Sequence, residues 1–141
     1  MKRTVALLGL ALLAFSANAS ALEAVSGKVY KGGNGVKVTI VRLKPLSDKK
    51  ALIEISGSDT ESDGKIVLHE IEEYDGKADY FIKKKKGSKT EKYVTIAMRN
   101  GSFEVYPPGG GNDGIRIAFD DKKSEELKVD DLLRRYTPDK K

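Results

Sequence analysis

The sequence contains no cysteine, no tryptophan and only one histidine in 141 residues. Without cysteine, the chain can form neither a disulfide framework nor a thiolate zinc site, and it has no cysteine nucleophile. The single histidine, His69, excludes a metal site that takes two histidines from one chain. Residues 107–112 are rich in proline and glycine but lack the Gly-Lys-Ser/Thr ending of a phosphate-binding P-loop. These absences remove several classes of enzyme.

The first 21 residues have the pattern of a secretory signal peptide. Lys2 and Arg3 form a basic start, residues 5–15 are apolar, and small residues precede two candidate cleavage sites, after Ala19 and after Ala21. The apolar run is too short to span the roughly 30 Å of a bilayer's hydrocarbon core. We therefore expect a periplasmic or secreted protein without a transmembrane segment, cleaved near Ala19 or Ala21.

Loss of the signal peptide lowers the formal net charge from +5 to +3, because Lys2 and Arg3 leave with it. So weak a positive charge does not favour specific nucleic-acid binding. Residues 22–141 are numerous enough to bury a core without disulfides, and we expect them to form one domain.

The rest of the chain is typical of an all-β protein. Turn dipeptides such as Asp75-Gly76 and Asn100-Gly101 separate short runs rich in β-branched and aromatic residues. We expect about eight strands in a mainly antiparallel meander, closed as a barrel or a sandwich. The expected strands are residues 27–31, 36–43, 51–56, 65–72, 79–84, 92–99, 102–106 and 115–119.

One short helix is expected at the C-terminus. Val129, Leu132, Leu133 and Tyr136 recur with the spacing of a helical stripe, and Pro138 ends it. A helix this short needs a surface to pack on. We therefore interpret it as a lid over one end of the sheet, with a partner-binding helix as the alternative.

Residues 59–70 resemble the twelve-residue calcium loop of EF-hand proteins. Acidic residues occupy loop positions one, three, five and twelve, and glycine occupies position six. The resemblance implies that calcium would be bound by carboxylate groups and one backbone carbonyl, from Asp59, Glu61, Asp63, Lys65 and Glu70. The flanking residues are predicted strands, whereas an EF-hand needs helices. We therefore favour an ordinary acidic hairpin turn over a calcium site, and no other cofactor is implied.

The second notable feature is a division of charge along the chain. Residues 54–79 contain nine acidic residues against two lysines, and residues 80–99 contain seven basic residues against one glutamate. Because alternate residues of a strand face opposite sides, consecutive lysines leave neither face buried. We predict a hairpin over residues 80–93 that projects beyond the core, with Gly87 and Ser88 near its tip. Its partner-binding residues would be Lys83, Lys84, Lys85, Lys86, Lys89 and Lys92.

Catalysis is not expected. His69 lies inside the apolar run 66–71, where a buried structural histidine is more common than a general base, and no Gly-x-Ser-x-Gly motif is present. The leading hypothesis is an exported, non-catalytic binding domain whose lysine hairpin engages an anionic envelope component or an acidic protein surface. The alternatives are a calcium-stabilised structural domain and, third, a small hydrolase or an enzyme inhibitor. Lysines can also simply protect a sheet edge from aggregation.

Overall fold

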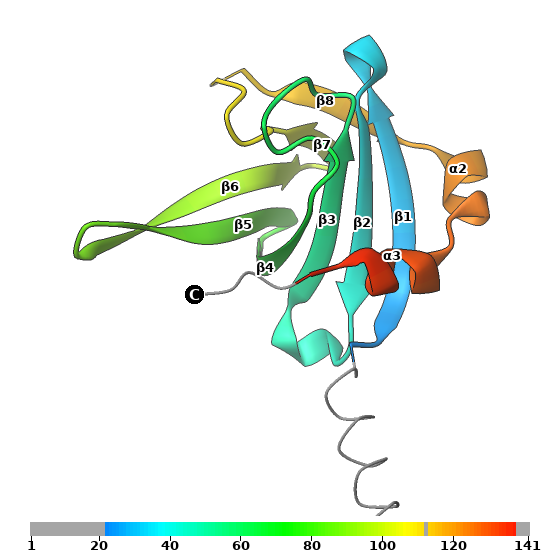
Figure 1. The fold of residues 1–141 in the computed structure, drawn as a ribbon, viewed down its shortest axis with the longest axis horizontal. Helices are drawn as coiled ribbons and strands as arrows, with labels where there is room; N and C mark the ends of the chain where they lie inside the picture. The colour runs from blue at the N-terminus through cyan, green and yellow to red at the C-terminus, as the bar shows by residue number, and fades with distance from the viewer. Residues whose placement is uncertain (1–21, 112, 138–141) are drawn as a thin grey trace, which may run out of the picture.

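Eight antiparallel strands pair in chain order and close into a barrel (Figure 1). The computed structural model describes residues 22–111 and 113–137, so the predicted signal peptide lies outside the described residues. The strands are β1 (Ala24–Gly32), β2 (Lys37–Leu43), β3 (Lys50–Ser56), β4 (Ile66–Tyr74), β5 (Lys77–Lys86), β6 (Lys89–Arg99), β7 (Ser102–Val105) and β8 (Ile115–Phe119). The short 3-10 turns η1 (Gly33–Gly35) and η2 (Leu46–Asp48) flank β2, and the helices α2 (Asp121–Glu126) and α3 (Val129–Arg135) follow β8. The all-β antiparallel prediction is confirmed, and the closure is a barrel.

Glycine turns shape the connections between the strands. Asp75 and Gly76 join β4 to β5 with φ angles of 45° and 73°. Positive φ at both central residues is the geometry that matches the twist of a two-residue hairpin. Gly57, after β3, also has a positive φ, and a Cβ atom there would lie 2.2 Å from the carbonyl oxygen of Gly35.

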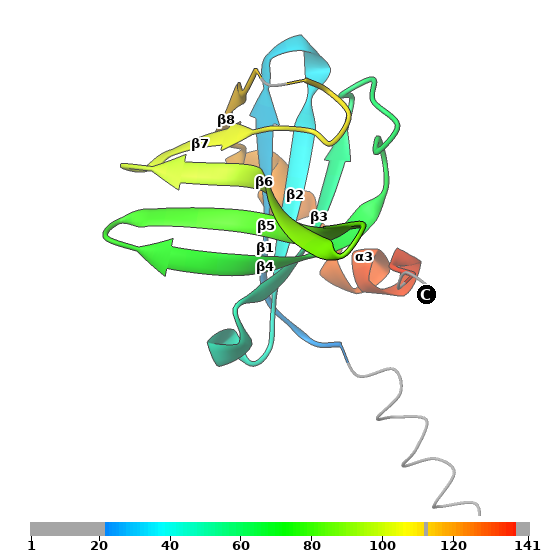
Figure 2. The same ribbon diagram turned by 90° about the vertical axis from the view of Figure 1, so that its left-hand side faces the viewer.

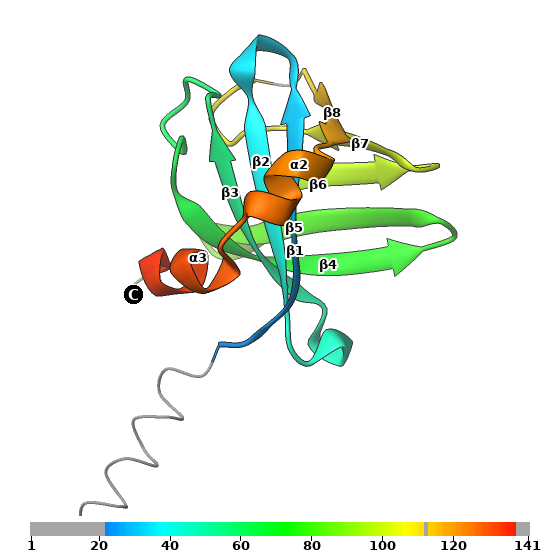
Figure 3. The same ribbon diagram turned by 90° about the vertical axis from the view of Figure 1, so that its right-hand side faces the viewer.

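The core has two parts, one inside the barrel and one outside it. The inner cluster is made of aliphatic residues from most strands, together with Tyr30. The outer cluster joins Val41, Leu43 and Leu52 to Leu132 of α3, which is 1% exposed. The predicted helix at residues 129–136 is therefore present, but it packs on the outer face of β2 and β3 and does not close an end of the sheet (Figure 3).

Helix α2, which the sequence analysis did not predict, covers a free strand edge. β1 pairs with β8 only from Tyr30 to Gly32, so no strand of the described residues pairs with the preceding part of β1 on that side. The Ser124 hydroxyl lies 2.8 Å from the Val29 nitrogen and 3.2 Å from the Val29 oxygen, and the Asp120 N–H donates to the same oxygen. None of the residues of this helix is buried. These polar contacts, together with the Asp120 cap on the Lys123 N–H, hold the helix in place of an apolar stripe.

Strands β4 and β5 pair over only part of their length. Their register runs from Tyr74↔Lys77 to Glu70↔Phe81 and stops there. Residues 66–69 of β4 continue alongside β3, whereas residues 82–86 of β5 continue alongside β6 and leave the barrel. We call these two diverging strand edges the seam.

Candidate functional site

The outer half of the β5–β6 hairpin projects from the barrel, as predicted (Figures 1 and 2). The two strands stay paired out to Lys86↔Lys89, with Gly87 and Ser88 at the turn. All described residues from 83 to 92 are exposed. The six predicted partner-binding lysines therefore lie together on an arm whose side chains are exposed.

On the outer face of this hairpin, acidic residues of β4 partly compensate the lysines. Directly opposite residues of an antiparallel pair share a face, so Lys83, Lys85 and Lys92 lie on one side with Phe81. Lys83 lies 3.8 Å from a carboxylate oxygen of Glu70, and Lys92 donates a hydrogen bond to Glu72. The Lys92 ammonium also lies 4.4 Å from the centroid of the Phe81 ring.

The inner face carries Lys84, Lys86 and Lys89 against a single acidic residue, Glu91. The Lys86 ammonium lies 3.5 Å from Glu91, and both side chains are well exposed, so this pair is screened by water. The Lys84 ammonium lies 5.3 Å from the centroid of the Tyr93 ring. Three lysines against one glutamate leave this side positively charged.

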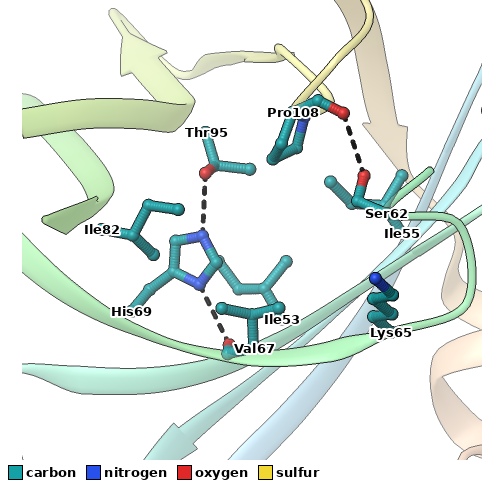
Figure 4. A pocket seen from close by; sticks show the side chains of 9 residues that line it. All are labelled: Ile53, Ile55, Ser62, Lys65, Val67, His69, Ile82, Thr95 and Pro108. Atoms are coloured by element: carbon teal, nitrogen blue, oxygen red, sulfur yellow. Dashed lines mark hydrogen bonds between the residues drawn. The ribbon is translucent and has the colours of Figure 1, made fainter. Parts of the chain in front are cut away.

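A small apolar cavity of about 30 Å³ lies where the inner face of the hairpin meets the barrel (Figure 4). His69 and Thr95 form part of its wall, and Lys65 is the only charged residue among those described that line it. The lining residues come from β3, β4, β5, β6 and the two loops above: Ile53, Ile55, Ser62, Lys65, Val67, His69, Ile82, Thr95 and Pro108.

A β-bulge places Thr95 against His69. The register passes from Tyr80↔Ile96 to Phe81↔Val94, so Thr95 is the extra residue on β6. Its hydroxyl lies 2.8 Å from His69 Nε2, while His69 Nδ1 lies 3.0 Å from the carbonyl oxygen of Val67. Because a carbonyl only accepts, Nδ1 carries the proton, and the Thr95 hydroxyl donates to Nε2.

Burial lowers the pKa of His69 to about 4, so the imidazole is neutral at physiological pH. Its side chain is 3% exposed and both ring nitrogens have partners. His69 is thus a buried histidine of the barrel wall, and its burial agrees with its place in an apolar run.

The residues of the predicted calcium loop do not gather around one point. Asp63 accepts hydrogen bonds from the backbone N–H and the hydroxyl of Ser58, at 2.9 and 3.2 Å. Glu70 lies in β4 beside Lys83, and Glu61 lies against Gly109. Among residues 22–111 and 113–137, no three acidic or histidine side chains are grouped so as to hold a metal ion. Asp59 and Lys65 lie in and at the end of the turn before β4, and the calcium hypothesis stays a prediction.

The cavity and the seam were not predicted from the sequence. The cavity depends on the bulge at Thr95, and the seam depends on where β4 and β5 stop pairing, and neither has a local sequence signal. The sequence feature that comes closest to predicting the seam is the lysine run, because a strand with charges on both faces must leave the barrel.

Comparison with protein-family models, curated protein sequences and solved structures gives no match for this chain. None of the helices that the described residues form is both long and apolar enough to cross a membrane.

Proposed function

We propose that this protein is an exported, non-catalytic binding domain that engages an anionic or acidic partner through the lysine-rich β5–β6 hairpin. The observation that carries the proposal is the projection of six lysines on an exposed arm that contributes little to the core beyond Phe81 and Ile82. Residues 83–92 of this arm are all exposed, so they bury no side chain in the barrel and present a cationic surface to a partner.

The barrel holds the root of this arm rigidly. The Tyr93 hydroxyl donates to the backbone oxygen of Tyr106 at 2.7 Å, and Ile82 lines the inner cavity. The ion pairs of Lys83 and Lys92 with β4 add to this support. The positive charge is therefore presented in a fixed direction, which lowers the ordering cost of binding.

The test compares a charge-reversed hairpin with a matched control. Lys85 and Lys89 have no ion-pair partner among the described residues, so Lys85→Glu with Lys89→Glu changes charge without breaking a contact. Lys37→Glu with Lys122→Glu makes the same charge change elsewhere, on strand β2 of the barrel and in α2. We expect the hairpin variant to elute from immobilised heparin at clearly lower salt than the control variant.

Reversal of all four lysines from Lys83 to Lys86 should abolish capture of heparin and of poly-L-glutamate. Each lysine near an anionic surface contributes about 1 kcal/mol, so four reversals weaken binding by well over a hundredfold. A circular dichroism spectrum and melting temperature like those of the wild type would show that the barrel is intact. Equal retention of the wild type, the hairpin variants and the control would refute the proposal.

A further inference from the structure

Two hollows lie on opposite sides of the seam between β4 and β5. The apolar cavity lies on the inner side, and a larger groove of about 460 Å³ lies on the outer side. Val67 and Ile82, one from each strand edge, line both of them. The outer groove is lined by Leu68 and Phe81 together with Lys50, Glu70, Lys83 and Lys84.

The backbone groups of both edges point into the seam. The Ile71 N–H donates to the Lys49 oxygen at 2.8 Å, so the odd-numbered residues of β4 face β3 and the even-numbered ones face β5. Glu70 and Glu72 accordingly pair with Phe81 and Asp79. Continued past Phe81, the same alternation turns the N–H and C=O groups of Lys83 and Lys85 towards the seam.

The two diverging strand pairs differ in whether their free edge is covered. Where β1 and β8 part, α2 covers the free edge with the contacts of Ser124 and Asp120 to Val29. Where β4 and β5 part, no side chain, helix or strand from residues 22–111 and 113–137 bonds to the seam-facing backbone of Lys83 or Lys85. An open strand edge is a template for another strand.

We infer that the seam binds an extended acidic segment of a partner protein, which adds to the edge of β5 as an antiparallel strand. This inference rests on the proposed function and names the partner's chemistry. In the inferred complex, the segment's residues that bond to the backbone of Lys83 and Lys85 lie on the same outer face as those lysines. These residues of the segment are acidic. The intervening residues face inwards, where the cavity is walled by Ile53, Val67 and Ile82, and there they are small and aliphatic.

An alternating aliphatic and acidic strand fits both hollows because side chains along a strand alternate between faces. Its carboxylates would lie opposite Lys83 and Lys85 and near Lys50, which also lines the outer groove. A sulfated glycan or an anionic lipid could meet the lysines but would leave the β5 backbone groups unpaired. The combination of an open backbone edge with this charge therefore selects a peptide.

The first experiment measures binding of a capped Glu-Val-Glu-Val-Glu-Val peptide to the mature protein by titration calorimetry. One derivative carries N-methyl groups on the three glutamates, whose N–H groups would face β5, and the matched control carries them on the three valines. Because each lost hydrogen bond weakens binding several-fold, we expect the glutamate derivative to bind at least about tenfold more weakly. The valine derivative should bind within about threefold of the parent peptide.

The second experiment changes the edge itself. Lys83→Pro and Lys83→Gln both remove one charge, but only Lys83→Pro also removes the N–H that faces the seam. Lys83→Pro should bind the parent peptide about fivefold more weakly than Lys83→Gln does, because it loses one hydrogen bond. Melting temperatures of the two variants check the fold, and the methylated peptides test the pairing without altering the protein.

Each outcome distinguishes this inference from the proposed function. Equal binding of both methylated peptides overturns the strand pairing, while hairpin-dependent capture of poly-L-glutamate would keep the proposed function. Tighter binding to anionic lipid vesicles than to the peptide would overturn the peptide assignment. Self-association that Lys83→Pro abolishes would show a second copy of this chain as the occupant, and it would also overturn the inference. Failure of all anionic probes would refute both proposals.

Discussion

Acidification should destabilise this barrel through one residue, His69. Its pKa is lowered to about 4 in the folded protein by burial, whereas an unfolded histidine titrates near its ordinary value of 6.5. Between these two values the unfolded chain binds more protons than the folded one, so stability falls as the pH falls through this window.

The size of this loss of stability follows from the difference between the folded and unfolded pKa values of His69. A difference of about 2.5 pKa units corresponds to a limiting loss of about 3 kcal/mol, of which about 2 kcal/mol is lost by pH 5. A domain of this size has only about 5–15 kcal/mol of stability in total, so the loss is readily measured.

Urea-induced unfolding of the mature protein at pH 7 and pH 5 is the appropriate assay, with His69→Gln as the comparison. Glutamine can donate to the Val67 carbonyl and accept from Thr95 without titrating, so the variant should keep most of its pH 7 stability on acidification. Carboxylates that titrate in this range do so in both proteins, and the difference between the two pH responses isolates His69. The reasoning is refuted if both proteins lose the same stability between pH 7 and pH 5.

Three further predictions concern packing, backbone geometry and metal. Leu132→Ala should lower the free energy of unfolding by about 3 kcal/mol, measured by urea unfolding, because it leaves a cavity between α3 and the barrel. A decrease below about 1 kcal/mol would mean that α3 is not docked in solution. Gly57→Ala should lower the melting temperature well below that of Gly64→Ala, because both positions have positive φ but only a Cβ at Gly57 meets a backbone oxygen; equal melting temperatures would contradict this. Roughly 1 mM Ca²⁺ should leave the melting temperature of chelator-treated protein unchanged, because no three acidic or histidine side chains of the described residues are grouped so as to hold a metal ion; a rise of several degrees would support the calcium hypothesis.

The barrel could be predicted from the sequence because its signals are local. Asp75-Gly76 and Asn100-Gly101 mark hairpin turns by their chemistry, and alternation such as that of Ile115 and Ile117 reveals which residues face inwards. Helix α2 has no such signal, since Ser124 holds it through contacts with a strand 95 residues away.

The candidate site was predicted in part. The lysine run identified a projecting hairpin, because charges on both faces of a strand exclude burial. The partial neutralisation of Lys83 and Lys92 by Glu70 and Glu72 was not predicted, because it depends on the register of three strands. The seam likewise arises where β4 stays with β3 while β5 leaves with β6, which is a property of the assembled sheet.

The short ladder between β1 and β8 has a consequence for how the molecule folds. Every other strand pairs with its neighbour in the chain, but Tyr30 of the first strand pairs with Phe119 of the last, 89 residues further along the chain. Contacts between such distant residues form slowly because a long loop must close before they are made. The meander should therefore assemble first. The barrel should close only once β8 and the helix that follows it have been synthesised. Until then β1 is an edge strand, and a chain interrupted before Ser124 would expose it to pairing with other molecules.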